Sequence, residues 1–198
     1  MTITFKIQLR DIKKPPVWRR LKIPGSFTFD EFHETIQAAF GWWNYHLYQF
    51  EKSPFGYGWT VKMPSESDWE IGNDVVDSQK TLVSTFLKKM KLKKFVYVYD
   101  FGDSWVHDIT LEKVDEKKEL PHPICLAGKG ACPYEDCGGT WGYEEIKRLF
   151  AEEPDSEETQ EYREWMGLDE NEEFDPKHFD IDEVNAKLVL IKQSQRRG

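Results

Sequence analysis

Apolar and polar residues alternate at the beginning of the chain. The apolar side chains occupy every second position, at Ile3, Phe5, Ile7 and Leu9. This period of two is typical of a strand with one buried face, so we predict a strand here. A second short strand is predicted over residues 17–23, because two prolines stand before it and a Pro-Gly pair follows it.

A helical pattern follows over residues 29–40. Its apolar residues recur every three or four positions, at Phe29, Phe32, Ile36 and Phe40. Thr28 and Glu31 have the spacing of a capping box, and Gly41 is placed to end the helix. We interpret the aromatic stripe as the face with which this helix packs on the core.

The rest of the pattern predicts short strands first and helices last. Strands are expected over residues 46–50, 59–63, 95–99 and 105–111, the last two as a hairpin that turns through 101–104. Residues 64–80 are polar and irregular, and helices are expected over 81–87, 143–153, 157–166 and 182–191. This order predicts an α+β fold: a single domain with a mostly antiparallel sheet, one early helix packed on it and a C-terminal group of helices. We place the domain at residues 1–192 and a frayed tail at residues 193–198.

Composition narrows the classes of protein to which the chain can belong. Its 198 residues are 39% hydrophobic and 15% aromatic, enough for one sizeable core. The net charge of −9 argues against a protein that coats nucleic acid. No apolar run approaches the roughly 20 residues that span a bilayer, and Met1–Lys6 lacks the features of a signal peptide. We therefore expect a cytoplasmic protein without a membrane partner.

Three cysteines lie close together in the sequence, at Cys125, Cys132 and Cys137. This odd number favours thiol or metal chemistry over a disulfide framework. Thiolates suit zinc, and a fourth ligand is available in His107 or His122, with Glu135 and Asp136 as weaker candidates. The spacing differs from that of the standard zinc modules. The alternatives are redox-active thiols, or ordinary buried thiols in a turn shaped by glycines.

Two aspartates and two histidines form a second group of candidates. Asp100, Asp103 and His107 fall within the expected hairpin, and His46 begins the strand expected at residues 46–50. If the two segments are neighbours, these side chains suit a divalent cation or acid–base catalysis. Against this, His107 shares a face with apolar residues, which is typical of a core histidine. The aspartates also flank Gly102, which suits a turn.

Five lysines form a basic segment, at Lys88, Lys89, Lys91, Lys93 and Lys94. Such a segment can contact phosphates and thus nucleic acid. The alternative is a solvated loop that balances an acidic chain, and the acidic helices near the C-terminus have the same simple interpretation.

Four motifs occur in one order along the chain: residues 16–20 (PVWRR), 40–50 (FGWWNYHLYQF), 99–107 (YDFGDSWVH) and 130–139 (GACPYEDCGG). Together they resemble the plasmid open-reading-frame-three-like family, whose members are also labelled transposon-passenger, TnpR-like proteins. The resemblance implies a compact α+β domain and makes His46 a position of interest, but it implies no particular activity. Two positions depart from the family pattern: Ser104 stands where Gly is usual, and Tyr48 where a second His is frequent.

Three functions follow from these observations. The first is an interaction or accessory module with an unidentified protein partner, associated with mobile DNA. The second is a metal-dependent enzyme of the zinc type, built around His107, Cys132 and Cys137. The third is a DNA-transaction factor that uses the basic segment at residues 88–94.

Overall fold

The strands assemble into one eight-stranded sheet within the part of the chain that the computed structural model describes, residues 1–65, 75–169 and 172–191. In chain order they are β1 (Thr2–Leu9), β2 (Trp18–Pro24), β3 (Tyr48–Glu51), β4 (Thr60–Lys62), β5 (Val75–Asp77), β6 (Lys94–Tyr99), β7 (Trp105–Asp115) and β8 (Ile124–Lys129). Their order in the sheet is β5-β4-β3-β6-β7-β1-β2-β8. Neighbours are antiparallel except β4 and β5, which are parallel.

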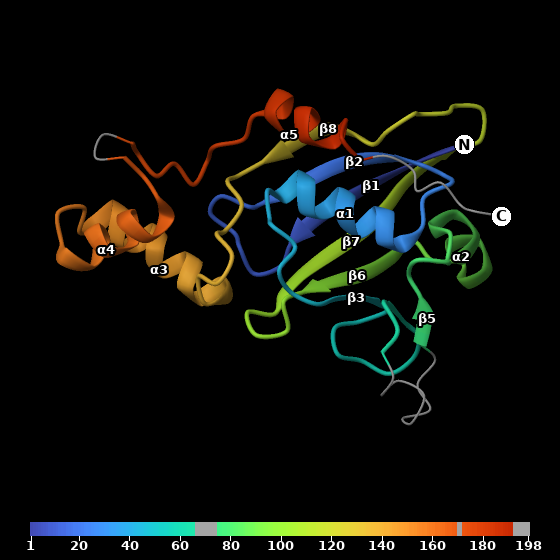
Figure 1. Ribbon diagram of the computed structural model, residues 1–198, viewed down its shortest axis with the longest axis horizontal. Coiled ribbons are helices and arrows are strands. Elements are labelled where there is room, and N and C mark those ends of the chain that lie inside the picture. The colour runs from blue at the N-terminus through green and yellow to red at the C-terminus, as the bar shows by residue number, and fades with distance from the viewer. Residues whose placement is uncertain (66–74, 170–171, 192–198) are drawn as a thin grey trace.

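Helices cover one face and one end of this sheet. They are α1 (Phe29–Phe40), α2 (Val83–Met90), α3 (Gly139–Glu152), α4 (Glu157–Met166) and α5 (Ile181–Leu188). Figure 1 shows α1 crossing the sheet, α5 near α1 and β8, and α3 with α4 together at one end. The predicted α+β class is thus confirmed, with one early helix on the sheet and a helical C-terminal part. Across the described ranges, each helix is too short or too polar to cross a membrane.

Helix α1 begins and ends where its sequence predicts. The Glu31 backbone N–H donates to Thr28 Oγ1 at 3.2 Å, and the Thr28 backbone N–H donates to Glu31 Oε2 at 2.6 Å. These two bonds are the predicted capping box. At the other end Gly41 has φ +83°, the left-handed conformation that stops a helix.

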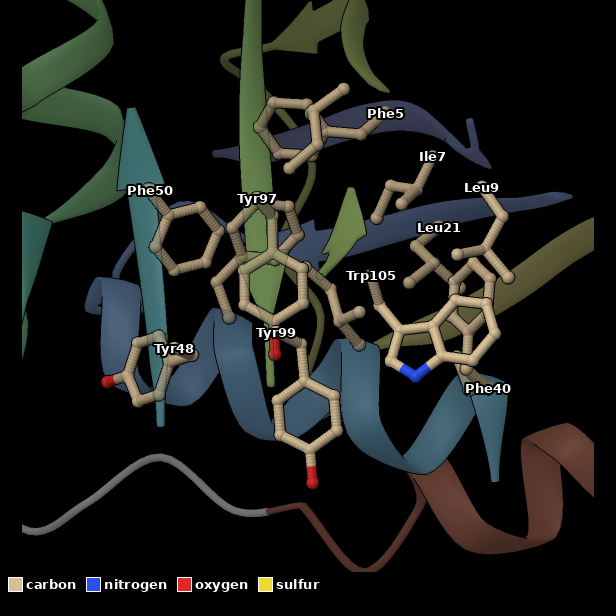
Figure 2. Packing of buried hydrophobic residues seen from close by; sticks show 14 of the residues in the cluster. Phe5, Ile7, Leu9, Leu21, Phe40, Tyr48, Phe50, Tyr97, Tyr99 and Trp105 are labelled. Atoms are coloured by element: carbon tan, nitrogen blue, oxygen red, sulfur yellow. The ribbon is translucent and has the colours of Figure 1, made fainter. Parts of the chain in front are cut away.

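The core lies between α1 and the sheet. The alternating apolar residues of β1 are all buried, which confirms that they share one face. The Phe32 ring of α1 stacks on Phe5 of β1 at 4.8 Å between centroids and on Phe50 of β3 at 5.6 Å. Figure 2 shows these strand residues converging on the helix side of the sheet, together with Tyr97 and Trp105. Burying a phenylalanine side chain contributes about 2 kcal/mol, so this contact fixes α1 on the sheet.

One predicted strand begins later than expected, and two strands were not predicted. The strand expected to begin at His46 begins at Tyr48, so His46 lies in the preceding loop. β5 lies in the stretch at 64–80 that looked irregular, and β8 was not predicted. Both are edge strands of the sheet, so they have few buried positions and only a weak alternation. The tail expected at 193–198 lies outside the described residues.

Candidate functional site

Three loops meet at the end of the sheet where β6 turns into β7. β3 pairs with β6 so that Tyr48 lies opposite Tyr99. The pairing continues one residue further, because the Asp100 backbone N–H donates to the Leu47 carbonyl at 2.9 Å. His46 is therefore placed beside Asp100, as expected if the two segments were neighbours.

The phenol of Tyr99 connects two of these loops. Its oxygen accepts the backbone N–H of Tyr45 at 3.0 Å and that of His46 at 3.4 Å, while its O–H donates to Glu135. Glu135 also accepts the Trp43 backbone N–H at 2.6 Å. These bonds hold the loop before β3 against the segment that contains the cysteines.

The hairpin turn is the third loop, and glycines allow its close approach to the cysteine segment. The Gly138 backbone N–H donates to Asp103 Oδ2 at 3.2 Å. Gly139 has φ +69°, and a Cβ there would lie 2.7 Å from the Asp103 carbonyl oxygen. A side chain at position 139 would thus force the two loops apart. Asp136, just before this contact, is itself left-handed with φ +60°.

His46, Asp100 and Asp136 converge where the three loops meet. His46 Nε2 lies 3.1 Å from Asp136 Oδ1 and 3.7 Å from Asp100 Oδ2. One donor atom from each of the three lies within 4.8 Å of the other two, the one such group found among the described residues. His46 Nε2 is buried, and neither approach gives it a hydrogen bond of normal geometry. Asp100 is buried, whereas the side chain of Asp136 is 65% exposed, so the group opens to solvent on one side.

One imidazole and two carboxylates make a ligand set for a divalent metal ion. Imidazole suits zinc, and carboxylate oxygens suit zinc and manganese as well as harder cations. Three protein ligands leave a coordination position for water, which is the arrangement of catalytic zinc sites. Without an ion, the same three side chains can form an ion-pair triad around a protonated His46.

The structure places the predicted aspartates and His46 in or beside this group. Asp103 serves the loop contact instead of joining the three donors. The sequence indicated Asp136 only as a weaker candidate for the fourth ligand of a site built on the three cysteines. Sequence reasoning missed Tyr99 and Glu135 as the residues that connect the loops; their presence inside two of the four motifs was the available signal.

His107 lies in the core, away from this group. Its side chain is fully buried, its Nδ1 contacts the Trp105 carbonyl at 3.0 Å, and its Nε2 has no hydrogen-bond partner among the described residues. The ring packs edge-on against Phe40 at 4.9 Å and Trp42 at 5.2 Å. Burial lowers the pKa of His107 to about 3, so the imidazole is neutral. These surroundings are those of a core histidine.

One cysteine lies on a strand, and the other two lie in the loop between β8 and α3. Cys125 lies on β8, where its backbone exchanges two hydrogen bonds with the Asn185 side chain of α5. Among the described residues, Cys125, Cys132, Cys137 and His107 do not supply three donor atoms within 4.8 Å. Burial raises the pKa of Cys137 to about 12 and that of Cys132 still further, which disfavours the thiolate that binds metal. A zinc site on these residues stays a prediction.

The predicted basic segment lies at the far end of β6 from Asp100. Lys88 and Lys89 occupy the last turn of α2, and Lys91 is its left-handed C-cap. Lys94 begins β6, which ends one residue before Asp100. In the last helical turn, lysines also interact favourably with the helix dipole, which gives two of them a structural role. A role in nucleic-acid binding stays a prediction.

Known proteins resemble this chain in sequence and in fold. The family model described as plasmid pRiA4b ORF-3-like protein matches residues 1–183. The uncharacterized protein y4hQ of Sinorhizobium fredii (strain NBRC 101917 / NGR234) is 36% identical over 165 residues, which are 83% of this chain and 80% of that protein. The crystal structure of MM3350 from Methanosarcina mazei Go1, a protein of unknown function, has 34% identity and a TM-score of 0.73. That likeness covers 92% of this chain and 97% of the other.

Proposed function

We propose that this chain, which belongs to the plasmid pRiA4b ORF-3-like family, is a metal-dependent hydrolase whose ion is held by His46, Asp100 and Asp136. The observation that carries the proposal is the convergence of three donor atoms around His46 Nε2, which is buried and has no hydrogen bond of normal geometry to the described residues. Hydrogen bonds hold the three loops together. The loop of His46 and the hairpin of Asp100 are each bonded to the segment that carries Asp136, and they are also bonded to each other. Zinc fits the set well, and manganese is the alternative ion.

The chemistry follows from the ligand count and the exposure. A bound zinc ion supplies a water whose pKa falls to about 7, and hence a nucleophile at neutral pH. Asp136 lies at the exposed side of the group, so a substrate would approach a bound ion from that side. Asp100 is buried and accepts the Gly102 backbone N–H at 2.9 Å through Oδ1, which holds its carboxylate in place.

A metal titration tests the proposal. Protein dialysed against a chelator is titrated with Zn²⁺ and separately with Mn²⁺ in a calorimeter. We expect one ion per chain, with at least a tenfold loss of affinity in Asp136→Asn and in His46→Gln, since each loses a direct ligand. Asp155→Asn, a change at an exposed aspartate between α3 and α4, is the matched control and keeps full affinity.

Other variants and a rate measurement complete the test. Cys132→Ser and Cys137→Ser keep full affinity if the ion sits at His46, and lose it if the cysteines bind. Hydrolysis of ester, phosphodiester and peptide model substrates is then compared between the metal-free and the metal-loaded protein. Absence of stoichiometric ion from the unmodified chain leaves His46, Asp100 and Asp136 as an ion-pair triad and refutes the proposal.

An interaction or accessory module is the second candidate function, and exposed aromatic side chains favour it. Trp43, Tyr45 and Trp141 are 74%, 75% and 79% exposed, although large aromatic residues usually contribute to cores or interfaces. Trp43 and Tyr45 lie in the same loop as His46, between α1 and β3. Such a module needs no ion, so the same titration separates it from the enzyme.

A further inference from the structure

A cavity of about 390 Å³ adjoins the proposed metal centre. His46 lines it, and so do its neighbour Leu47 and the hairpin residue Phe101, which follows Asp100. The opposite lining comes from α1 and β4, through residues such as Glu34 and Lys62. One wall of the cavity is thus formed by the same loops that carry the ligands.

Three of the side chains that line this cavity are large, apolar and exposed to solvent. Leu47 is 71% exposed, Met63 52% and Phe101 41%. Single exposed apolar residues are common, but three that line one cavity mark a place where an apolar group is received. The lining therefore favours a ligand with an apolar part.

The helix side of the cavity is acidic. Asp30 and Glu34 of α1 line it, and within the described residues neither carboxylate has a basic group within ion-pair distance. Asp30 lies in the first turn of α1, where the helix dipole stabilises an acid, and it accepts the Tyr48 O–H at 2.6 Å. Glu34 lies one turn further on, beyond the reach of that dipole. Burial and repulsion by Asp30 and Glu31 raise the pKa of Glu34, so its charge is poorly compensated.

The other polar groups of the lining offset this negative charge only in part. His33 is neutral, because burial lowers its pKa to about 4. Both of its ring nitrogens are also in use, Nδ1 with the Tyr97 hydroxyl at 2.7 Å and Nε2 with Asn44 Oδ1 at 2.8 Å. Lys62 is the one lysine among the described lining residues, against two carboxylates. The cavity thus combines an apolar rim with an acidic wall.

We infer that this cavity is the substrate pocket of the proposed hydrolase and that it takes a ligand with a cationic nitrogen, an ammonium or a guanidinium group, carried on an apolar stem. The inference rests on the proposed function in one respect: the bond to be hydrolysed is taken to lie near His46. Binding of the cationic nitrogen does not depend on it. The cationic nitrogen pairs with Glu34 and Asp30, while the stem lies on Leu47, Met63 and Phe101. A lysine or arginine side chain of a peptide and a free polyamine share this chemistry.

Binding of small probes to metal-free protein tests the inference separately from the metal. The probes are the Nα-acetyl amides of lysine, arginine and norleucine, together with spermidine, titrated at one low ionic strength. We expect the cationic probes to bind at least tenfold more tightly than norleucine amide, whose side chain has a similar length and no charge. Tighter binding of the amino-acid amides than of spermidine identifies a peptide ligand, and the reverse order identifies a polyamine.

Variants of the acidic wall identify where the probe binds. Glu34→Gln keeps the shape of the side chain and is expected to weaken the cationic probes about tenfold, with Asp30→Asn as a second variant should the first fold poorly. Glu158→Gln, at an exposed acid of α4, is the matched control. Equal affinity for norleucine amide, or full affinity in both wall variants, overturns the inference. Because no metal is present, these results do not depend on the metal titration, and failure of either proposal is recognised separately.

Discussion

Ser104 has a backbone conformation that its side chain disfavours. Its φ is +55°, in the left-handed region where a Cβ costs about 1 to 2 kcal/mol and glycine costs little. A left-handed backbone here accounts for the family pattern, in which glycine is usual at this position and from which Ser104 departs. We predict that Ser104→Gly stabilises the protein by about 0.5 to 1 kcal/mol, since the added freedom of the unfolded chain offsets part of the gain. Unfolding in urea, followed by tryptophan fluorescence, measures the change.

The matched control for this change is Ser104→Ala. It removes the hydroxyl, which donates to the Phe101 carbonyl at 3.3 Å, and keeps the Cβ. Ser104→Ala should therefore not stabilise the protein. Equal gains in both variants would show that the hydroxyl, and not the backbone conformation, limits stability here.

Single residues of the candidate site were only partly predictable from the sequence. His46 and Asp100 were identified because a histidine and an aspartate are chemically distinctive and stood in motifs. Asp136 was ranked low because the neighbouring Cys137 drew attention to thiol chemistry. Which donors meet depends on hydrogen bonds between loops, such as that between Trp43 and Glu135, and these have no signal in local spacing.

Tyr99 shows how one strand organises two loops beyond its end. Tyr99→Phe removes the acceptor of the Tyr45 and His46 backbone N–H groups and the donor to Glu135. We predict a loss of about 1 to 3 kcal/mol in unfolding free energy, because these groups lose their partner in a partly buried place. Metal affinity should also fall, since His46 is no longer held beside Asp100. Urea unfolding and the Zn²⁺ titration measure the two effects.

The control for Tyr99→Phe is the same substitution at an exposed tyrosine. Tyr57 is fully exposed, so Tyr57→Phe should change neither stability nor metal affinity. If Tyr99→Phe lowers stability but leaves the affinity for Zn²⁺ unchanged, Tyr99 supports the fold without positioning His46.

The sequence predicted those features of helices and strands that are determined by residues close together in the chain. The alternation in β1 and the capping box of α1 depend on residues close in the chain, and both are confirmed. β5 and β8 exist because they pair with β4 and β2 at the two edges of the sheet. Partners that distant in sequence leave little local pattern, which is why these two strands were not predicted.

Two buried neutral histidines make the stability of the whole molecule sensitive to acid. Burial lowers the pKa of His33 to about 4 and that of His107 to about 3, from an ordinary value of 6.5. Between these values the unfolded chain binds protons that the folded chain does not, so stability falls as the pH falls. Their contribution is complete above pH 6.5 and is lost as the pH decreases towards 3. Together they amount to several kcal/mol, since each pKa unit corresponds to about 1.4 kcal/mol.

Urea unfolding at pH 7, 6, 5 and 4 tests this prediction through the slope of stability against pH. His107→Gln removes one of the two titrating groups, so its slope should be shallower than that of the unmodified chain, whatever its absolute stability. His178→Gln, the same substitution at an exposed histidine, is the control for the exchange itself. The net charge of −9 acts in the opposite direction, since protonating surface carboxylates relieves their repulsion. A stability that stays level or rises between pH 7 and pH 4 would therefore contradict the predicted fall, because this relief would then equal or exceed the cost of protonating His33 and His107.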